Sequence, residues 1–189
     1  NIGYDNSLMV HNFINKQSEQ LNSSVLNGGA GDQGIVYGYA VNNNFNYLPY
    51  GVYIANKVAK SLDEYKRANS YLKSDGKVQV TIDSDTIINL TISIQHTQDA
   101  IIESVRKDIK NLISSIIDVD NTIISINNNS RFINGGFIND TGLTGRKIMV
   151  DTYGGIVNHG GGAFSGKDPS KIDRSAAYMA RFIAKNIDR

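Results

Sequence analysis

The stretch Lys77–His96, KVQVTIDSDTIINLTISIQH, decides the fold of the first half of this chain. Apolar and polar residues alternate on both sides of Asp83-Ser84-Asp85, and this period of two is typical of strands with one buried face. Because Asp and Ser favour tight turns, the two alternating runs predict a β-hairpin.

Periodic segments flank the hairpin. Residues 50–69 and 98–117 carry apolar side chains at helical spacing, and residues 122–127 return to a strand pattern. The β-branched and aromatic run at residues 34–41 predicts a further, buried strand. The resulting order β-α-β-β-α-β is that of a split βαβ unit. We therefore expect an α+β fold of repeated units, with helices covering one face of mainly antiparallel sheets.

The composition limits the possible functions. The chain of 189 residues carries a net charge of +1 and has no cysteine, which excludes disulfides, catalytic thiolates and cysteine-based zinc sites. The charge gives no reason to expect nucleic acid or a membrane as the main partner. No apolar run approaches the roughly 20 residues of a transmembrane helix. The expected location is the cytoplasm.

The character of the chain changes after residue 127, where long polar, glycine-rich segments begin. Loops of this length in a compact chain are usually functional or disordered, and the aromatic residues kept here favour function. A strand is predicted at residues 147–151. A helix is predicted to begin at Asp168, with Asp168 as its N-cap and Pro169 in its first turn.

The segment GGGAFSGKDPSK at residues 160–171 contains a G-x-x-x-x-G-K pattern. Asp168 stands where a Walker A motif needs Ser or Thr to hold Mg²⁺, so that motif is excluded. Lys167 and Lys171 beside glycines at a helix N-terminus predict a cradle for polyphosphate. The alternative is a tight turn with solvated lysines.

Other charged residues also stand next to glycines. Asp32 lies between two glycines and is either the tip of a turn or a carboxylate presented to an ammonium group or a metal. Arg131-Phe132 and Arg146-Lys147 combine phosphate-binding side chains with, in the first pair, a flat face for a base. Solvated arginines beside a core aromatic residue are the alternative. The histidines show no metal-binding spacing.

The segments GAGDQG at residues 29–34 and GGGAFSGKD at residues 160–168 resemble the two signature motifs of the S-adenosylmethionine synthase (methionine adenosyltransferase) family. GLTGRKIMVDTYGG and DPSKIDRSAAYMARFIAKNI are also similar to that family. The resemblance spans nearly the whole chain but about the middle half of a family member, and the family's His-Pro-Asp-Lys segment is absent. We therefore expect both ends to be cut from a longer protein.

The resemblance implies three regions and an activity. Residues 1–27 would end the N-terminal domain and include the active-site lid, residues 28–134 would form the central domain, and residues 135–189 would start the C-terminal domain. The implied reaction forms S-adenosylmethionine from ATP and L-methionine with Mg²⁺ and K⁺. The active site would lie at the subunit interface of a homo-oligomer, either a dimer or a tetramer.

The resemblance also implies roles for individual residues. Lys167, Arg146 and Lys147 would be catalytic, and Asp173 would be a Mg²⁺ ligand rather than a member of a surface ion pair. The implied ATP-binding residues are Asp75, Lys77, Arg131, Phe132, Asp140, Arg146, Lys147, Ala163 and Lys167. The implied methionine-binding residues are Gln17, Asp32, Asp140 and Lys171.

The sequence departs from the family pattern in several places. NNNS replaces Asn-Pro-Thr-Gly before Arg131, Phe137 follows Gly135-Gly136 where the family has Pro, Asn139 replaces a Gly, and the lid is short. We expect the chain of 189 residues alone to be inactive, because a metal ligand and the family's histidine are missing from it. The alternative function is a non-catalytic nucleotide- or polyphosphate-binding module.

Overall fold

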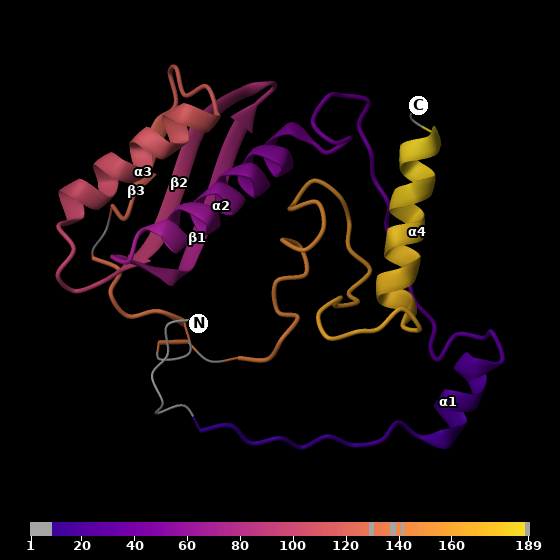
Figure 1. The fold of residues 1–189 in the computed structure, drawn as a ribbon. Coiled ribbons are helices and arrows are strands. Elements are labelled where there is room, and N and C mark those ends of the chain that lie inside the picture. The colour runs from indigo at the N-terminus through magenta and orange to yellow at the C-terminus, as the bar shows by residue number, and fades with distance from the viewer. Residues whose placement is uncertain (1–8, 129–130, 137–138, 141, 188–189) are drawn as a thin grey trace. The chain divides into compact units, whose positions relative to one another are not determined.

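The computed structural model describes residues 9–128, 131–136, 139–140 and 142–187 (Figure 1). Two compact units are present. Among the described residues, unit 1 is the segment from Tyr50 to Asp140, and unit 2 combines residues 9–49 with residues 142–187. None of the helices in these ranges is both long and apolar enough to cross a membrane.

Unit 1 contains the predicted hairpin and both predicted helices. Its elements are α2 (Tyr50–Ala68), β1 (Leu72–Asp83), β2 (Thr86–His96), α3 (Ile102–Ile116) and β3 (Ile123–Ile126). The sequence-based prediction of an α+β fold is confirmed. Unit 2 contains α1 (Glu19–Leu26) and α4 (Ile172–Ile187).

The strands form one sheet in the order β1-β2-β3. β1 and β2 are antiparallel, and Asp83 pairs with Thr86 across a two-residue turn. Ser84 in that turn has a φ of 55°, the left-handed conformation that hairpin turns require. β3 runs parallel to β2, with Leu90 opposite Ile124, because α3 returns the chain to the same end of the sheet.

The core of unit 1 lies between the sheet and the helices. Alternate side chains of β2 (Leu90, Ile92 and Ile94) are almost completely buried, as the period-two pattern predicts. α2 and α3 cover this face of the sheet (Figure 1) and bury Ile54, Val58, Leu62, Val105, Ile109 and Ile113 against it. Each such side chain contributes about 1.5–3 kcal/mol to stability when fully buried.

The predicted strand at residues 34–41 is wrong. These residues are extended but are not paired in a sheet, and Ile35 is 66 % exposed. The segment lies along α4, and a Cβ atom on Gly38 would be 2.1 Å from the backbone carbonyl of Ala180. The β-branched and aromatic residues therefore serve packing against a helix, which composition alone cannot distinguish from packing in a sheet.

The predicted strand at residues 147–151 is also wrong, because this segment forms turns. The Asp151 N–H donates to the Lys147 carbonyl at 3.0 Å, and the Gly154 N–H donates to the Met149 carbonyl at 2.9 Å. These local bonds use the groups that a strand would pair with a neighbour.

The last helix begins later than predicted, at Ile172 rather than Asp168. The Asp168 carboxylate accepts the Ser170 N–H at 2.8 Å, and its carbonyl accepts the Lys171 N–H at 3.1 Å, so Asp168 caps a separate turn. Hydrogen bonds from the Ser170 side chain and from its backbone N–H hold the pKa of the Asp168 carboxyl below its ordinary value. One separate turn, from Asp168 to Lys171, therefore replaces the expected first helical turn.

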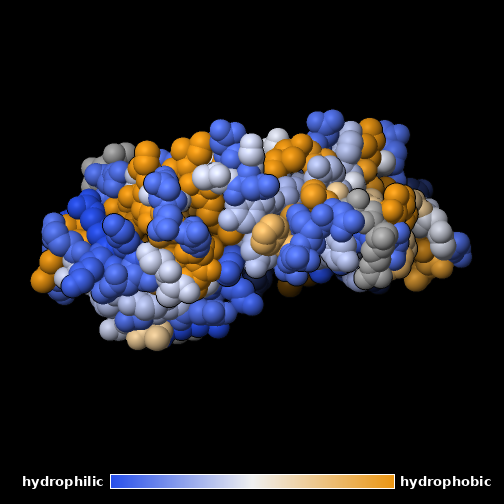
Figure 2. Space-filling model, turned by 90° about the horizontal axis from the view of Figure 1, so that it is seen from above, coloured by the Kyte–Doolittle hydropathy of each residue, from blue (hydrophilic) through white to orange (hydrophobic). Residues whose placement is uncertain are grey.

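Unit 2 keeps many apolar side chains at its surface. α4 has no buried residue, and its exposed apolar side chains are Tyr178, Met179, Phe182, Ile183 and Ile187. Figure 2 shows hydrophobic residues interspersed with hydrophilic ones on the face viewed from above. Contacts with the backbone of residues 38–47 hold the helix in place.

Candidate functional site

The predicted site residues fall into two groups, one in each unit. Unit 1 contains Asp75, Lys77, Arg131, Phe132 and Asp140. Unit 2 contains Gln17, Asp32, Arg146, Lys147, Ala163, Lys167, Lys171 and Asp173.

Asp75 lies at an irregularity in β1, where the pairing with β2 shifts between Leu72 and Gly76. The Asp75 carboxylate accepts the Gly136 N–H at 2.8 Å, and the Asp75 N–H donates to the Gln95 side-chain oxygen at 3.2 Å. The shift turns Asp75 out of the regular ladder, so its carboxylate reaches the loop that follows β3.

Phe132 lies in that loop and pairs with the end of β2. The His96 N–H donates to the Phe132 carbonyl at 2.9 Å, and the Phe132 N–H donates to the His96 Nε2 at 3.2 Å. A Cβ atom on Gly135 would be 2.9 Å from the Asp75 Oδ2 and 3.0 Å from the Phe132 ring. Asp75 and Phe132 therefore meet around a glycine that leaves room for both.

The other predicted residues of unit 1 are less closely tied together. Arg131 donates to the carbonyls of Gln98 and Ala100, the latter at 3.0 Å, so its guanidinium binds the backbone just before α3. Lys77 on β1 and Asp140 in the loop both have exposed side chains. The sequence pattern identified Arg131 but not these backbone partners.

In unit 2, Lys167 and Asp173 form an ion pair of 2.5 Å between Nζ and Oδ2. Each side chain is 31 % exposed, so a ligand from solvent can reach both charges. A Cβ atom on Gly162 would be 2.2 Å from the Asp173 Oδ1, and the carboxylate therefore rests on bare backbone. The partner of Asp173 is Lys167 of the preceding loop, whereas the alternative predicted a surface ion pair with neighbouring residues of the helix.

Of the residues predicted to bind methionine, Gln17, Asp32 and Lys171 belong to unit 2, and Asp140 belongs to unit 1. The Lys171 Nζ donates to the Gln17 Oε1 at 3.1 Å, and this bond joins two predicted residues that are distant in sequence. Asp32 accepts the N–H of Gln33 at 2.7 Å through Oδ1 and is exposed. This bond joins Asp32 to its immediate neighbour in a bend of the chain, and both alternatives for Asp32 remain predictions.

Three further predicted residues of unit 2 lie in or beside turns. A Cβ atom on Gly145 would be 2.6 Å from the Ala163 side chain, so the segment before Arg146 contacts the glycine loop. Arg146 folds back over Gly142, whose added Cβ would be 2.6 Å from the Arg146 Nη1. The side chains of Arg146 and Lys147 are both exposed.

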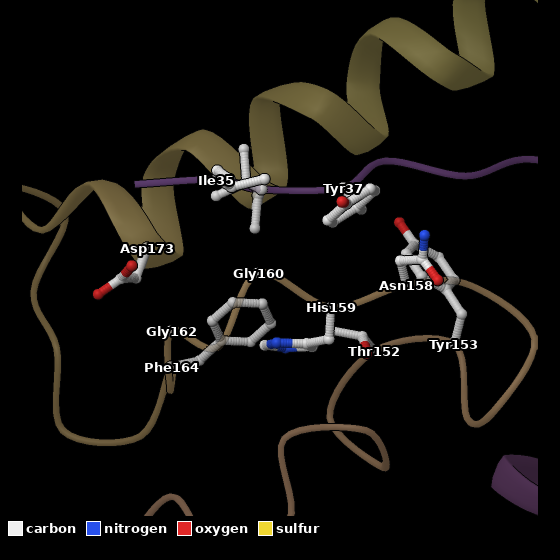
Figure 3. Close-up of a pocket in the computed structure, with 12 residues that line it drawn as sticks. Ile35, Tyr37, Thr152, Tyr153, Asn158, His159, Gly160, Gly162, Phe164 and Asp173 are labelled. Carbon is white, nitrogen blue, oxygen red and sulfur yellow. The ribbon is translucent and has the colours of Figure 1, made fainter. Parts of the chain in front are cut away.

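A pocket lies beside the ion pair (Figure 3). Figure 3 shows Asp173 at one end, the rings of Phe164 and His159 along the wall, and Tyr153 at the other end. The His159 Nδ1 accepts the Gly161 N–H at 2.8 Å, which fixes the glycine loop on this side. Sequence reasoning missed Tyr153 and the role of His159, because neither belongs to a local charge pattern.

The structure also bears on the metal prediction. Among the described ranges, no three or more His, Cys, Asp and Glu side chains converge in a group that could hold a metal ion. The Asp173 carboxylate that was predicted as a Mg²⁺ ligand is bound by the Lys167 ammonium.

Comparison with known protein families gives two matches that together cover residues 27–189. Residues 27–134 match the family model for the central domain of S-adenosylmethionine synthetase. Residues 134–189 match the model for the C-terminal domain of S-adenosylmethionine synthetase.

Proposed function

The chain belongs to the S-adenosylmethionine synthetase family, and we propose that it carries ATP- and methionine-binding residues of a methionine adenosyltransferase. In this reaction the methionine sulfur attacks C5′ of ATP, and the C5′–O bond to the tripolyphosphate breaks. The tripolyphosphate is then hydrolysed to phosphate and pyrophosphate. Such a site must align the two reactants and neutralise a highly charged leaving group.

The Lys167–Asp173 pair beside Gly162 is the observation that carries the proposal. The Lys167 ammonium is paired with a carboxylate that itself rests on the bare backbone of Gly162, and phosphate oxygens can approach such a place closely because no side chain intervenes. Bound polyphosphate would replace the Asp173 carboxylate at the Lys167 Nζ. Arg146, Lys147 and Ala163 are proposed to line the same polyphosphate.

Asp173 supplies part of the ligand set that the expected Mg²⁺ would need. Mg²⁺ in proteins is often bound by one or two carboxylates together with substrate phosphates, so a single carboxylate released from Lys167 is a suitable donor. Mg²⁺ bound there would supply positive charge to the polyphosphate leaving group. K⁺ remains part of the proposal without an assigned residue.

Asp32, Lys171, Gln17 and Asp140 are proposed to bind methionine. The exposed Asp32 carboxylate suits the substrate ammonium group, and the Lys171 ammonium suits the substrate carboxylate. The contact between Lys171 and Gln17 supports their assignment to one site. Asp75, Lys77, Arg131, Phe132 and Asp140 are proposed to bind ATP, with Phe132 stacking on adenine.

The remaining parts of the proposal concern the whole protein. We propose a cytoplasmic homo-oligomer, a dimer or a tetramer, with the active site at the subunit interface. The family matches meet at residue 134, which supports a domain boundary there. The inactivity of residues 1–189 alone remains a prediction.

Calorimetric titration of the chain with Mg²⁺-tripolyphosphate tests the proposal. Lys167→Ala should weaken binding at least about tenfold, since a charge-assisted contact contributes about 1.5–3 kcal/mol. Lys110→Ala, which removes an exposed lysine of α3, is the matched control and should bind as the parent does. Equal affinities for all three chains would contradict the assignment of Lys167.

Titration with L-methionine separates the enzyme from a simple nucleotide-binding module. Methionine should bind to the parent chain and should bind more weakly to Asp32→Asn, which keeps the size of the side chain but loses its charge. A chain that binds ATP but not methionine would support the nucleotide-binding module instead.

A further inference from the structure

Three buried polar residues lie in or next to the sheet of unit 1. Among the described residues, the buried polar side chains are Gln95 (6 % exposed), His96 (0 %) and Asn127 (6 %). Asn127 donates to the Ile94 carbonyl and accepts the Ile94 N–H, so it completes the pairing of β2. Gln95 and His96 instead bind the irregular part of β1 and the loop that follows β3, and their burial requires a reason.

The Gln95 side chain joins two segments. Its Oε1 accepts the Asp75 N–H at 3.2 Å, and its Nε2 donates to the Ile133 carbonyl at 2.9 Å. The orientation of the amide follows from these partners, since the backbone N–H can only donate and the carbonyl can only accept. One buried amide therefore holds the irregular part of β1 against the loop that follows β3.

The His96 ring holds the same loop one residue away. The Nε2 accepts the Phe132 N–H at 3.2 Å, so the proton must lie on Nδ1, which donates to the Thr97 carbonyl at 2.8 Å. Both bonds exist together only in the neutral Nδ1–H tautomer. The backbone of His96 also donates to the Phe132 carbonyl at 2.9 Å, which fixes Phe132 on both sides.

We propose that Gln95 and His96 are positioning residues that hold Asp75 and Phe132 in the geometry needed for ATP. This inference rests on the ATP-binding roles proposed above for Asp75 and Phe132. At the end of β2 the two buried side chains contact the irregular part of β1 and the loop that follows β3, and Gly135 leaves no spare space between Asp75 and Phe132. Binding groups need this kind of support because small displacements cost much of their effect.

The test compares variants at the two ends of the sheet. Gln95→Met removes both side-chain hydrogen bonds at nearly constant volume. Thr122→Val is the matched control, because Thr122 donates to the Ile87 carbonyl at 2.8 Å near the opposite end of β2. Calorimetry would measure the binding of a non-hydrolysable ATP analogue and, separately, of tripolyphosphate to the folded chains.

Gln95→Met should weaken binding of the ATP analogue about tenfold, as expected for the loss of one or two neutral hydrogen bonds. Its affinity for tripolyphosphate should remain within about twofold of the parent value, because Lys167 lies in unit 2. Thr122→Val should leave both affinities unchanged. Unchanged binding of the ATP analogue by Gln95→Met, or an equal loss in Thr122→Val, would overturn the proposal.

Nuclear magnetic resonance reads the positioning directly and does not depend on the proposed function. Imidazole ¹⁵N shifts should show His96 protonated at Nδ1, and the Gly136 amide signal should move in Gln95→Met but not in Thr122→Val. Protonation at Nε2 or an unmoved Gly136 signal would refute positioning.

If the parent chain binds no ATP analogue while these signals behave as expected, the proposed function fails and the positioning stands. If Gln95→Met does not fold, Gln95→Glu replaces it, with an intermediate loss expected because it retains the acceptor for Asp75.

Discussion

Unit 1 and unit 2 hold their candidate site residues by different means. In unit 1 a sheet and two helices enclose a continuous apolar core, and buried polar side chains connect that core to Asp75 and Phe132. In unit 2 the buried apolar residues among those described are Pro49 and Tyr153, and α4 has no buried residue. Apolar burial therefore fixes the site residues of unit 1, whereas close backbone contacts and charged hydrogen bonds fix those of unit 2.

Arg181 on α4 shows how unit 2 compensates for its small core. Its guanidinium donates to the carbonyls of Tyr39, Asn46 and Tyr47, the last two at 2.8 and 3.0 Å, and lies 5.9 Å from the centre of the Tyr153 ring. Asn46 and Tyr47 have φ values of 58° and 57°, which are uncommon outside glycine. The arginine therefore stabilises a strained turn as well as joining it to α4.

The largest expected effect is on the free energy of unfolding, and it tests the difference in apolar burial between the two units. Leu90→Ala, in the completely buried row of β2, should lower the free energy of unfolding by about 3 kcal/mol, because it removes buried methyl groups and leaves a cavity. Met179→Ala on α4 is the control. Met179 is 57 % exposed, so its loss should change stability by less than about 0.5 kcal/mol in the same urea denaturation experiment. Similar losses in the two variants would mean that α4 is as well buried as the sheet.

The next effect tests the close backbone contacts of unit 2. Gly160→Ala would place a Cβ atom 1.6 Å from the Ile35 carbonyl oxygen, so the two segments must separate at a cost of about 1–3 kcal/mol. Gly155→Ala, whose Cβ would have no atom within 4 Å, is the control and should be neutral. Hydrogen exchange of the amides at residues 34–41 measures the result. Equal protection in both variants would show that the contact contributes nothing.

A smaller effect is expected from the charged hydrogen bonds of unit 2. Arg181→Met keeps the length of the side chain but removes three bonds to backbone carbonyls, and it should cost about 1–2 kcal/mol. Arg181→Lys, which keeps the charge without the planar fork, should recover only part of this loss. Proteolysis at residues 39–47 measures the opening. Full recovery by lysine would show that charge alone is sufficient.

The smallest effect concerns pH and the turn before α4. The lowered pKa of Asp168 means that its carboxylate form is favoured in the folded chain, so its contribution is present above the ordinary carboxyl pKa. That contribution should disappear as the pH falls through the lowered pKa, because protonation weakens the bond from Ser170. Asp168→Asn keeps an acceptor oxygen and should show less pH dependence of the Ser170 amide signal. An equal dependence in both chains would assign the titration to another group.

The sequence predicted the hairpin, α2, α3 and β3 well because their periodic patterns match their final burial. It failed at residues 34–41 and 147–151, since short β-branched runs do not show whether a neighbouring strand, a helix or a local turn will take their hydrogen bonds. It identified the charged residues of the candidate site through the family motifs. It missed Gln95 and His96 because a polar pair at the end of a strand has no local signature of its partners.

The sequence by itself determined the α+β class, the hairpin around Asp83-Ser84-Asp85, and the family, since these depend on local periodicity, turn chemistry and contiguous motifs. The tertiary structure alone decided which long-range partners each polar group found. Lys167 pairs with Asp173, and Gln95 joins Asp75 to the loop after β3, only because the chain brings distant segments together. The physical reason is that a hydrogen-bonding group in the sequence specifies its chemistry, whereas burial and chain geometry select its partner.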